Sequence, residues 1–220
     1  MSPVMLAGKP APWPVGKVVC VGRNYADHAR ELNNPVPSTP ILFIKPATAV
    51  VPFAEEISIP AAKGECHHEL ELALLIGKPL TAVTPEQAAA GIAGYGLALD
   101  LTLRELQSQL KAKGQPWELA KSFDGACPVS GFVEPQRLAQ PQNARLQLSI
   151  NERIQQDGNT NAMLTPILEL LAFISAHFTL RPGDLVLTGT PAGVGPLQDG
   201  DLVVARLNDE EFARARIARL

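Results

Sequence analysis

The 220-residue sequence is poor in cysteine, in aromatic residues and in excess charge of either sign. Its three cysteines, Cys20, Cys66 and Cys127, are odd in number and widely spaced, which argues against a disulfide framework and a structural zinc site. With 19 basic and 22 acidic residues the formal net charge is −3, so we expect no nucleic-acid partner. No apolar run reaches the ~18 residues of a membrane helix, and residues 1–14 lack a secretory signal pattern. These absences predict a cytoplasmic protein that acts away from membranes.

Proline and glycine are abundant where aromatic residues are few. The chain has 20 Pro and 17 Gly, and only 5% of its residues are aromatic. Many turns and few long helices follow, so a β-rich fold is expected and a helical bundle is not. Residues 1–16 are Pro-rich and weakly patterned, which predicts an N-terminal arm before a single domain over residues 17–220.

Short apolar runs and helix signals predict the element order. Strands are expected over residues 17–22, 41–44, 67–76, 94–101, 128–133, 145–151, 184–188 and 201–207. Helices are expected over residues 24–32, from 84, over 102–114 and over 165–177, with Asn24 as a helix cap and capping boxes that begin at Thr84 and Thr102. Strands and helices do not alternate regularly, so an α+β, β-rich fold, a mixed β-sandwich or roll, is favoured over a parallel dinucleotide-binding sheet.

Three carboxylates are placed as a metal site would require. Glu69 and Glu71 are two apart on a predicted strand and share a face about 6–7 Å apart, while Leu70 and Leu72 point to the core. Asp100 ends the next apolar strand. Oxygen ligands without a thiolate favour a hard divalent ion, Mg²⁺, Mn²⁺ or Ca²⁺, over zinc. A solvated strand face is the alternative for the two glutamates alone.

Basic and polar residues stand at the ends of neighbouring elements. Arg23, Lys45, Arg104 and Lys121 could neutralise an anionic substrate, and Arg104 and Gln107 share a helix face just after Asp100. Each could also be a surface charge. Because they follow Asp100 directly, Arg104 and Gln107 are the better candidates of this group.

Two further patterns could contribute chemistry. His28 and Glu31 are three apart on a predicted helix, a spacing that can prepare a general base, although an exposed pair is the simpler interpretation. Residues 188–195 form a Gly-rich turn in which Thr190 could help to hold a carboxylate. The turn matches neither a phosphate-binding loop nor a dinucleotide motif, and no nucleophile elbow occurs, so nucleotide binding and covalent hydrolysis are disfavoured.

Taken together, six ordered motifs resemble the fumarylacetoacetate hydrolase family, and most closely its short bacterial acylpyruvase and oxaloacetate-processing members. The motifs are residues 19–25 (VCVGRNY), 42–46 (LFIKP), 67–71 (HHELE), 94–102 (GYGLALDLT), 121–124 (KSFD) and 187–195 (LTGTPAGVG). The resemblance spans residues 17–207, so it covers nearly the whole chain.

The resemblance implies a mixed β-sandwich roll, usually a homodimer, whose catalytic domain here would be residues 17–220, with one Mg²⁺ or Mn²⁺ per subunit. It places the metal ligands on Glu69, Glu71 and Asp100. It places the catalytic residues on His28, Glu31 and Lys121. Substrate contacts would come from Arg23, Lys45, Arg104, Gln107 and Thr190.

The reaction implied first is hydrolysis of a carbon–carbon bond in an acylpyruvate, a 2-oxo acid, to pyruvate and a carboxylic acid. Oxaloacetate decarboxylation or keto–enol tautomerisation on the same metal site is the alternative. A hydratase or isomerase of 2-hydroxy-dienoates, or a 2-oxo-acid binding protein without turnover, are more distant ones. Residues 31–40, which follow the His28–Glu31 pair, are expected to form a lid over the site.

Overall fold

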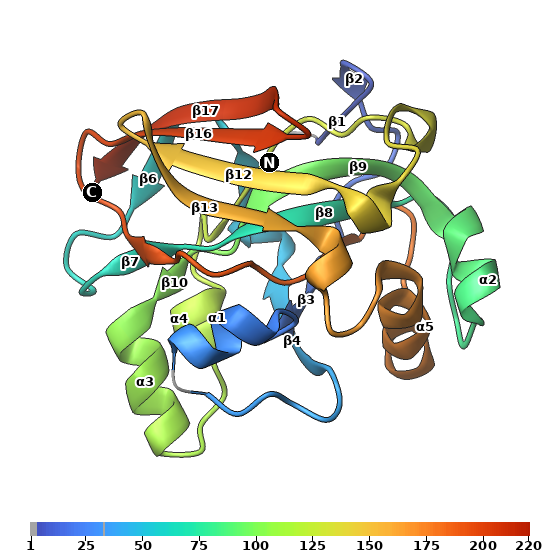
Figure 1. Ribbon diagram of the computed structural model, residues 1–220, viewed down its shortest axis with the longest axis horizontal. Helices are drawn as coiled ribbons and strands as arrows, with labels where there is room; N and C mark the ends of the chain where they lie inside the picture. The colour runs from blue at the N-terminus through green and yellow to red at the C-terminus, as the bar shows by residue number, and fades with distance from the viewer. Residues whose placement is uncertain (1–3, 33) are drawn as a thin grey trace.

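Figure 1 shows the computed structural model, which describes residues 4–32 and 34–220. The first three residues of the predicted arm and residue 33 of the predicted lid lie outside the described residues. Within these described ranges, no helix combines the length and apolar character that crossing a membrane requires.

A seven-stranded mixed sheet forms the centre of the fold, in the order β4-β3-β14-β8-β9-β11-β5. Its strands are β3 Lys17–Gly22, β4 Ile41–Pro46, β5 Val50–Pro52, β8 Leu70–Ile76, β9 Ile92–Leu99, β11 Cys127–Val129 and β14 Leu185–Leu187. β14 pairs with β3 and β11 with β5 in parallel, whereas the other neighbours are antiparallel. The mixed pairing explains why the sequence shows no regular βαβ alternation.

A five-stranded sheet packs over one face of the first sheet, in the order β13-β12-β16-β17-β6 (Figure 1). Its strands are β6 Ala54–Ile59, β12 Arg145–Ile150, β13 Arg153–Asn159, β16 Leu202–Leu207 and β17 Glu210–Arg219. Two small sheets complete the strands: β10-β7-β15 and β1-β2. Their strands are β1 Met5–Leu6, β2 Lys9–Pro10, β7 Cys66–His68, β10 Thr102–Leu103 and β15 Gly195–Pro196.

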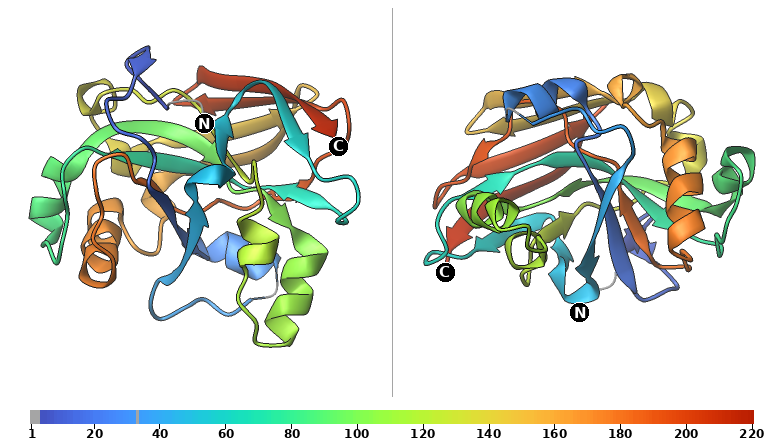
Figure 2. Two further views of the ribbon diagram at one scale, coloured as in Figure 1. Left: turned by 180° about the vertical axis from the view of Figure 1, so that it is seen from behind. Right: turned by 90° about the horizontal axis from the view of Figure 1, so that it is seen from below.

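The helices are short and lie in two groups. They are α1 Ala26–Glu31, α2 Pro85–Ala88, α3 Arg104–Ala112, α4 Glu118–Lys121 and α5 Ile167–His177. Figure 1 shows α1, α3 and α4 gathered at one end of the molecule, while α2 and α5 lie on the opposite side. Figure 2 shows the same separation from behind and from below. The first group covers the end of the central sheet at which the predicted site residues stand.

The central strand β8 is buried on both faces. Leu70 and Leu72 join a large apolar cluster shared with the five-stranded sheet, whereas Ala73 and Leu75 join a second cluster on the opposite face. Every residue of β8 is buried, which is why the strand is a nearly continuous apolar run. Glu71 interrupts this run, so its carboxylate enters the protein interior.

All eight predicted strands are confirmed in position, and the β-rich mixed sandwich roll is confirmed as the fold. The predicted strand 67–76 is divided at Glu69, and the predicted strand 128–133 is shorter, ending at Val129. Three strands of the five-stranded sheet, β6, β13 and β17, were not predicted. In β13 most side chains are exposed, so it lacks an apolar face. In β17, buried Ala213, Ala215 and Ile217 alternate with arginines. This alternation is typical of a strand, but it was not recognised in the sequence.

One of the three predicted helix caps is confirmed. Thr84 and Gln87 form the capping box of α2, and the Thr84 N–H donates to Gln87 Oε1 at 3.0 Å. The Asn24 cap is wrong, because Tyr25 precedes α1 and the Asn24 side chain instead bonds the backbone of Thr165 and Thr188. The Thr102 capping box is also wrong, because Thr102 lies in β10 and donates to the Asp100 carbonyl at 3.0 Å.

Candidate metal centre and active site

Three carboxylates meet where β7, β8 and β9 end. Antiparallel pairing sets Leu70 of β8 opposite Leu99 of β9, so Glu69 and Asp100 become neighbours across the strand pair. The Asp100 N–H donates to the Glu69 carbonyl at 2.8 Å, which fixes this register. One carboxylate oxygen each from Glu69, Glu71 and Asp100 lies within 4.8 Å of the others.

The chemistry of this carboxylate cluster fits a hard divalent cation. Glu69, Glu71 and Asp100 are only 4%, 1% and 1% exposed, so the solvated strand face considered for the glutamates is excluded. Burial, followed by the charges of Asp100 and Glu69, holds the pKa of Glu71 well above its usual range. Like charges buried this closely need compensation, and an all-oxygen ligand set is the one that Mg²⁺ and Mn²⁺ prefer.

Lys121 and Arg104, which line the pocket, contact carboxylate oxygens of the cluster. Lys121 Nζ lies 2.8 Å from Glu69 Oε2 and 2.6 Å from Asp100 Oδ2, and Arg104 donates to Glu69 Oε1. Burial by itself would raise the pKa of Glu69, but Lys121 and Arg104 outweigh it and hold that pKa below its usual range. Burial likewise disfavours the charged Lys121, yet Asp100 and Glu69 raise the pKa of Lys121 above its ordinary value. Lys121 is therefore a buried ammonium group beside the cluster.

Lys45 lies behind Asp100 and does not line the pocket. It is fully buried, and its Nζ lies 2.8 Å from Asp100 Oδ1 and 3.1 Å from the Ala126 carbonyl, with the Lys121 carbonyl as a third partner. Two of these contacts are hydrogen bonds to backbone carbonyls and the third is an ion pair, so the ammonium group is held away from the pocket. Lys45 therefore holds Asp100 and the end of α4. The resemblance implies a substrate contact for this residue, but its side chain does not reach the pocket.

His28 and Glu31 face one another on α1. His28 Nδ1 lies 3.5 Å from Glu31 Oε2, a distance at which a hydrogen bond is long but can tighten when substrate binds. The Gly193 N–H donates to Glu31 Oε1 and Oε2 at 3.0 and 3.2 Å, which ties α1 to the Gly-rich turn. Burial lowers the pKa of His28, and the charge of Glu69 opposes this only in part. His28 is therefore a neutral imidazole near pH 7.

The Gly-rich turn reaches the cluster through Gly189 and Thr190. The Gly189 N–H donates to Glu71 Oε2 at 2.6 Å, and Gly189 has φ of 95°. A side chain there would stand 2.7 Å from Asn24 Cβ, so glycine is required by both conformation and space. The Thr190 hydroxyl donates to the Leu70 carbonyl at 2.8 Å, so toward a substrate it can only accept.

Gln156, which the sequence analysis did not identify, connects this turn to the cluster. Its Oε1 accepts from the Leu70 N–H at 2.9 Å and faces His68 Nδ1 at 3.0 Å, and its Nε2 donates to Thr190 Oγ1 at 2.8 Å. Gln156 is fully buried in β13. No sequence signal identified it, because β13 itself was not predicted.

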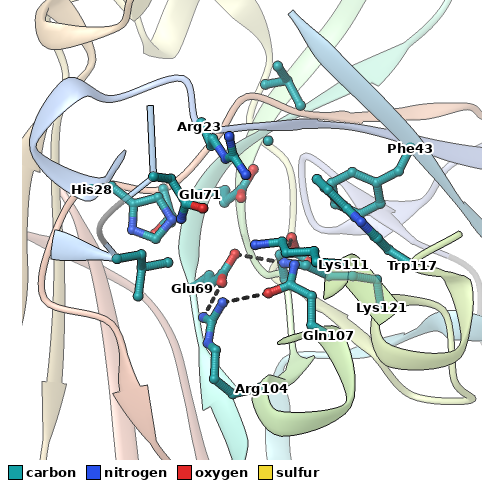
Figure 3. Close-up of a pocket in the computed structure, with 16 residues that line it drawn as sticks. Arg23, His28, Phe43, Glu69, Glu71, Arg104, Gln107, Lys111, Trp117 and Lys121 are labelled. Carbon is teal, nitrogen blue, oxygen red and sulfur yellow. Dashed lines mark hydrogen bonds and ion pairs between the residues drawn. The ribbon is translucent and has the colours of Figure 1, made fainter. Parts of the chain in front are cut away.

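The carboxylate cluster and the side chains around it line one pocket of about 400 Å³, a volume that includes its solvent-open part (Figure 3). The predicted residues that line it are Arg23, His28, Glu69, Glu71, Asp100, Arg104, Gln107, Lys121 and Thr190. Arg104 Nη1 donates to Gln107 Oε1 at 2.9 Å, which confirms that the two share a helix face. Phe43, Lys111 and Trp117 also line the pocket and were not predicted, whereas Asn34, which lines it too, lies in the segment 31–40 that was predicted as a lid. Lys111 follows Gln107 by four residues, a helical spacing that could have identified it.

Comparison with known proteins agrees with this arrangement. Oxaloacetate tautomerase YcgM of Escherichia coli (strain K12) is 53% identical over 190 residues, 86% of this chain and 87% of that protein. The bovine mitochondrial oxaloacetate tautomerase FAHD1 is 45% identical over 208 residues, 94% of each chain. The crystal structure of fumarylpyruvate hydrolase from Pseudomonas aeruginosa in complex with Mn²⁺ and pyruvate matches with a TM-score of 0.92 at 36% identity, covering 100% of this chain and 97% of that one.

The family model described as the fumarylacetoacetate (FAA) hydrolase C-terminal domain matches residues 17–218, and the chain therefore belongs to the fumarylacetoacetate hydrolase family of enzymes.

Proposed function

We propose that this enzyme is a divalent-metal-dependent oxaloacetate keto–enol tautomerase. The observation that carries the proposal is the buried carboxylate cluster, with Lys121 against it, His28 lining the same pocket and Glu31 Oε2 at 3.5 Å from His28 Nδ1. The tautomerase activity of the E. coli and bovine relatives favours oxaloacetate as the substrate. Oxaloacetate tautomerisation, which the sequence left open as an alternative, is therefore preferred to acylpyruvate hydrolysis.

Glu69, Glu71 and Asp100 would hold the metal ion, Mg²⁺ or Mn²⁺, one per subunit. When bound, the ion would act as a Lewis acid that stabilises negative charge on the 2-oxo oxygen of the substrate. The Mn²⁺ and pyruvate in the P. aeruginosa fumarylpyruvate hydrolase support this choice of metal and of a 2-oxo acid. Arg104 and Gln107, at the start of α3, are the side chains best placed to orient the substrate carboxylate beside the cluster.

Tautomerisation needs a base for carbon and an acid for oxygen. The neutral His28 would accept the proton from C3 of keto-oxaloacetate, and Glu31 would stabilise the imidazolium that forms. Lys121, a buried ammonium group, would donate a hydrogen bond to the 2-oxo oxygen as negative charge develops there. One C–H bond breaks at C3, and the O–H bond of the enol forms with a proton from a solvent water that serves as the acid. The imidazolium of His28 then returns its proton to solvent.

Acylpyruvate hydrolysis is the second candidate. The same His28–Glu31 pair could deprotonate a water molecule that attacks the distal carbonyl, and the P. aeruginosa fumarylpyruvate hydrolase shares the fold at 36% identity. Oxaloacetate decarboxylation would use the same electron sink, with loss of CO₂ in place of proton transfer. All three reactions pass through negative charge on the same oxygen.

A single set of assays separates these reactions. The purified protein, loaded with Mg²⁺ or Mn²⁺, is mixed with enol-oxaloacetate, and the enol absorbance and pyruvate formation are followed together. Tautomerase activity removes the enol band without forming pyruvate, whereas decarboxylation forms pyruvate, and hydrolysis consumes acetylpyruvate in a parallel assay. We expect rapid enol loss that EDTA and Asp100→Ala abolish. Enol loss no faster than the uncatalysed rate would overturn the proposal.

The proposal also includes the assembly and setting expected from the sequence: a homodimer, a single catalytic domain over residues 17–220, and a cytoplasmic location. Light scattering coupled to size-exclusion chromatography tests the homodimer, which predicts about twice the 23.5 kDa chain mass.

A further inference from the structure

Lys111 extends a stripe of pocket-lining side chains on α3. Arg104, Gln107 and Lys111 are spaced at three and four residues, so they lie along one helix face. Seven residues of helix separate Arg104 from Lys111 by about 10 Å along the axis. The stripe therefore begins beside the carboxylate cluster and leads away from it along the pocket wall.

The Lys111 ammonium group is held inside the pocket. Its Nζ lies 5.3 Å from the centroid of the Trp117 ring, and the side chain is half-buried. Figure 3 shows Lys111 extending from α3 toward the middle of the pocket, with Arg23 entering from the opposite side. Arg23 has φ of 60°, a left-handed conformation that is uncommon outside glycine and concentrates at functional sites.

Lys111 and Arg23 differ from the other pocket cations in having no acidic partner within residues 4–32 and 34–220. Lys121 pairs with Glu69 and Asp100, and Arg104 pairs with Glu69. Among the described residues, no carboxylate lies within 4.0 Å of the charged nitrogens of Lys111 or Arg23. Burial is the largest cause that lowers the pKa of Lys111 to about 8, and the charges of Arg23, Arg104 and Lys121 add to it, while only the charge of Glu69 opposes them. Positive charge therefore outweighs negative charge around this ammonium group.

We propose that Lys111 and Arg23 form a subsite for the far carboxylate of the substrate, and that this subsite selects 2-oxo dicarboxylates over 2-oxo acids with a neutral far end. The inference rests on the proposed function, because the 2-oxo carboxylate is taken to bind at the cluster end of the stripe. A dicarboxylate would supply the missing negative charge at Lys111. A neutral tail would leave two partly desolvated cations without a partner, which is unfavourable.

The test compares two substrates that differ at the far end alone, where a charged carboxylate is replaced by a neutral methyl ester: oxaloacetate and its C4 monomethyl ester. In Lys111→Met the aliphatic stem stays against Trp117 while the charge is lost. We expect KM for oxaloacetate to rise roughly 10- to 100-fold, the usual worth of a charged hydrogen bond, while KM for the monoester stays unchanged. Lys111→Arg should restore selectivity for oxaloacetate.

Lys113→Met is the matched control, because Lys113 is exposed two residues further along and does not line the pocket. It should leave both KM values unchanged. An equal rise for both substrates in Lys111→Met, or no rise for either, would overturn the subsite.

A binding measurement separates this inference from the proposed function. Malate and its C4 monomethyl ester are 2-hydroxy analogues that cannot enolise, so calorimetric titration of the Mg²⁺-loaded protein needs no turnover. Malate should bind the wild type more tightly than its ester, and Lys111→Met should remove that preference. If wild-type enzyme fails to convert oxaloacetate but keeps this preference, the tautomerase proposal fails and the subsite stands. If the preference is absent, the subsite fails whatever the activity.

Discussion

His28 shows how burial sets the chemistry of a single residue. The imidazole is 5% exposed, and desolvation keeps it neutral near pH 7, the state that a base requires. Glu31 is bound by the Gly193 backbone, so it can orient the ring only while the Gly-rich turn holds its place.

We predict that His28→Ala lowers kcat for oxaloacetate tautomerisation about 10²- to 10⁴-fold, the usual contribution of general base catalysis, without weakening Mg²⁺ binding. Steady-state kinetics and calorimetric Mg²⁺ titration measure the two effects. His177→Ala, which removes an exposed histidine on α5, should change neither quantity. Full activity in His28→Ala would remove this residue from the mechanism.

Lys111 should make substrate binding depend on pH. Its pKa is about 8, lowered by burial and by Arg23, Arg104 and Lys121 against the opposing charge of Glu69. The charged form, which binds a carboxylate, prevails below this pH and is lost above it. KM for oxaloacetate should therefore rise between about pH 8 and pH 9.5, and the rise should be absent in Lys111→Arg, whose guanidinium stays charged. A rise of the same size in both proteins would assign the titration to another group.

At the scale of elements, β17 joins two distant parts of the chain, although no strand was predicted over its residues. It pairs antiparallel with β16 and parallel with β6, so it joins a strand from the first third of the chain to the C-terminal hairpin. Its parallel partner is more than 150 residues away, a pairing that no local pattern reveals.

We predict that Ile217→Ala, at a position 2% exposed in β17, lowers the free energy of unfolding by about 2–5 kcal/mol. Arg216→Ala, its exposed neighbour, should change that free energy by less than about 0.5 kcal/mol. Urea unfolding followed by circular dichroism measures both variants. Equal effects would mean that the inner face of β17 contributes no more than its outer face.

At the scale of the whole molecule, a metal ion would join distant parts of the chain. The carboxylate cluster links β7, β8 and β9, and its hydrogen bonds and ion pairs extend to α3, α4 and the turn after β14. Because the unfolded chain lacks this cluster, metal binding should stabilise the folded protein by mass action.

We predict that Mg²⁺ at about 100 times its Kd adds about 2.7 kcal/mol of stability and raises Tm by roughly 5–10 °C. Glu71→Gln keeps the shape of the side chain and an acceptor for the Gly189 N–H, but should remove most of the Mg²⁺-dependent increase. Glu56→Gln, at an exposed position on β6, should retain it. Thermal unfolding with Mg²⁺ or EDTA measures the difference. An undiminished Mg²⁺ effect in Glu71→Gln would exclude this carboxylate as a ligand.

The sequence by itself determined the features that depend on local periodicity. A spacing of two placed Glu69 and Glu71 together, and a spacing of three placed Arg104 beside Gln107. Apolar runs located six of the seven strands of the central sheet, because residues buried on both faces must be apolar. The three-residue strand β5, which is only partly buried, was not predicted.

Only the tertiary structure decided which distant residues meet. The register of β8 and β9 brings Asp100 to Glu69, and burial assigns Lys45 to Asp100 in place of the pocket. Gln156 and Lys111 acquire their places in the same way, from strand pairing and from the packing of α3 against the pocket. Pairing and packing join residues far apart in the chain, and spacing along the sequence carries no record of either.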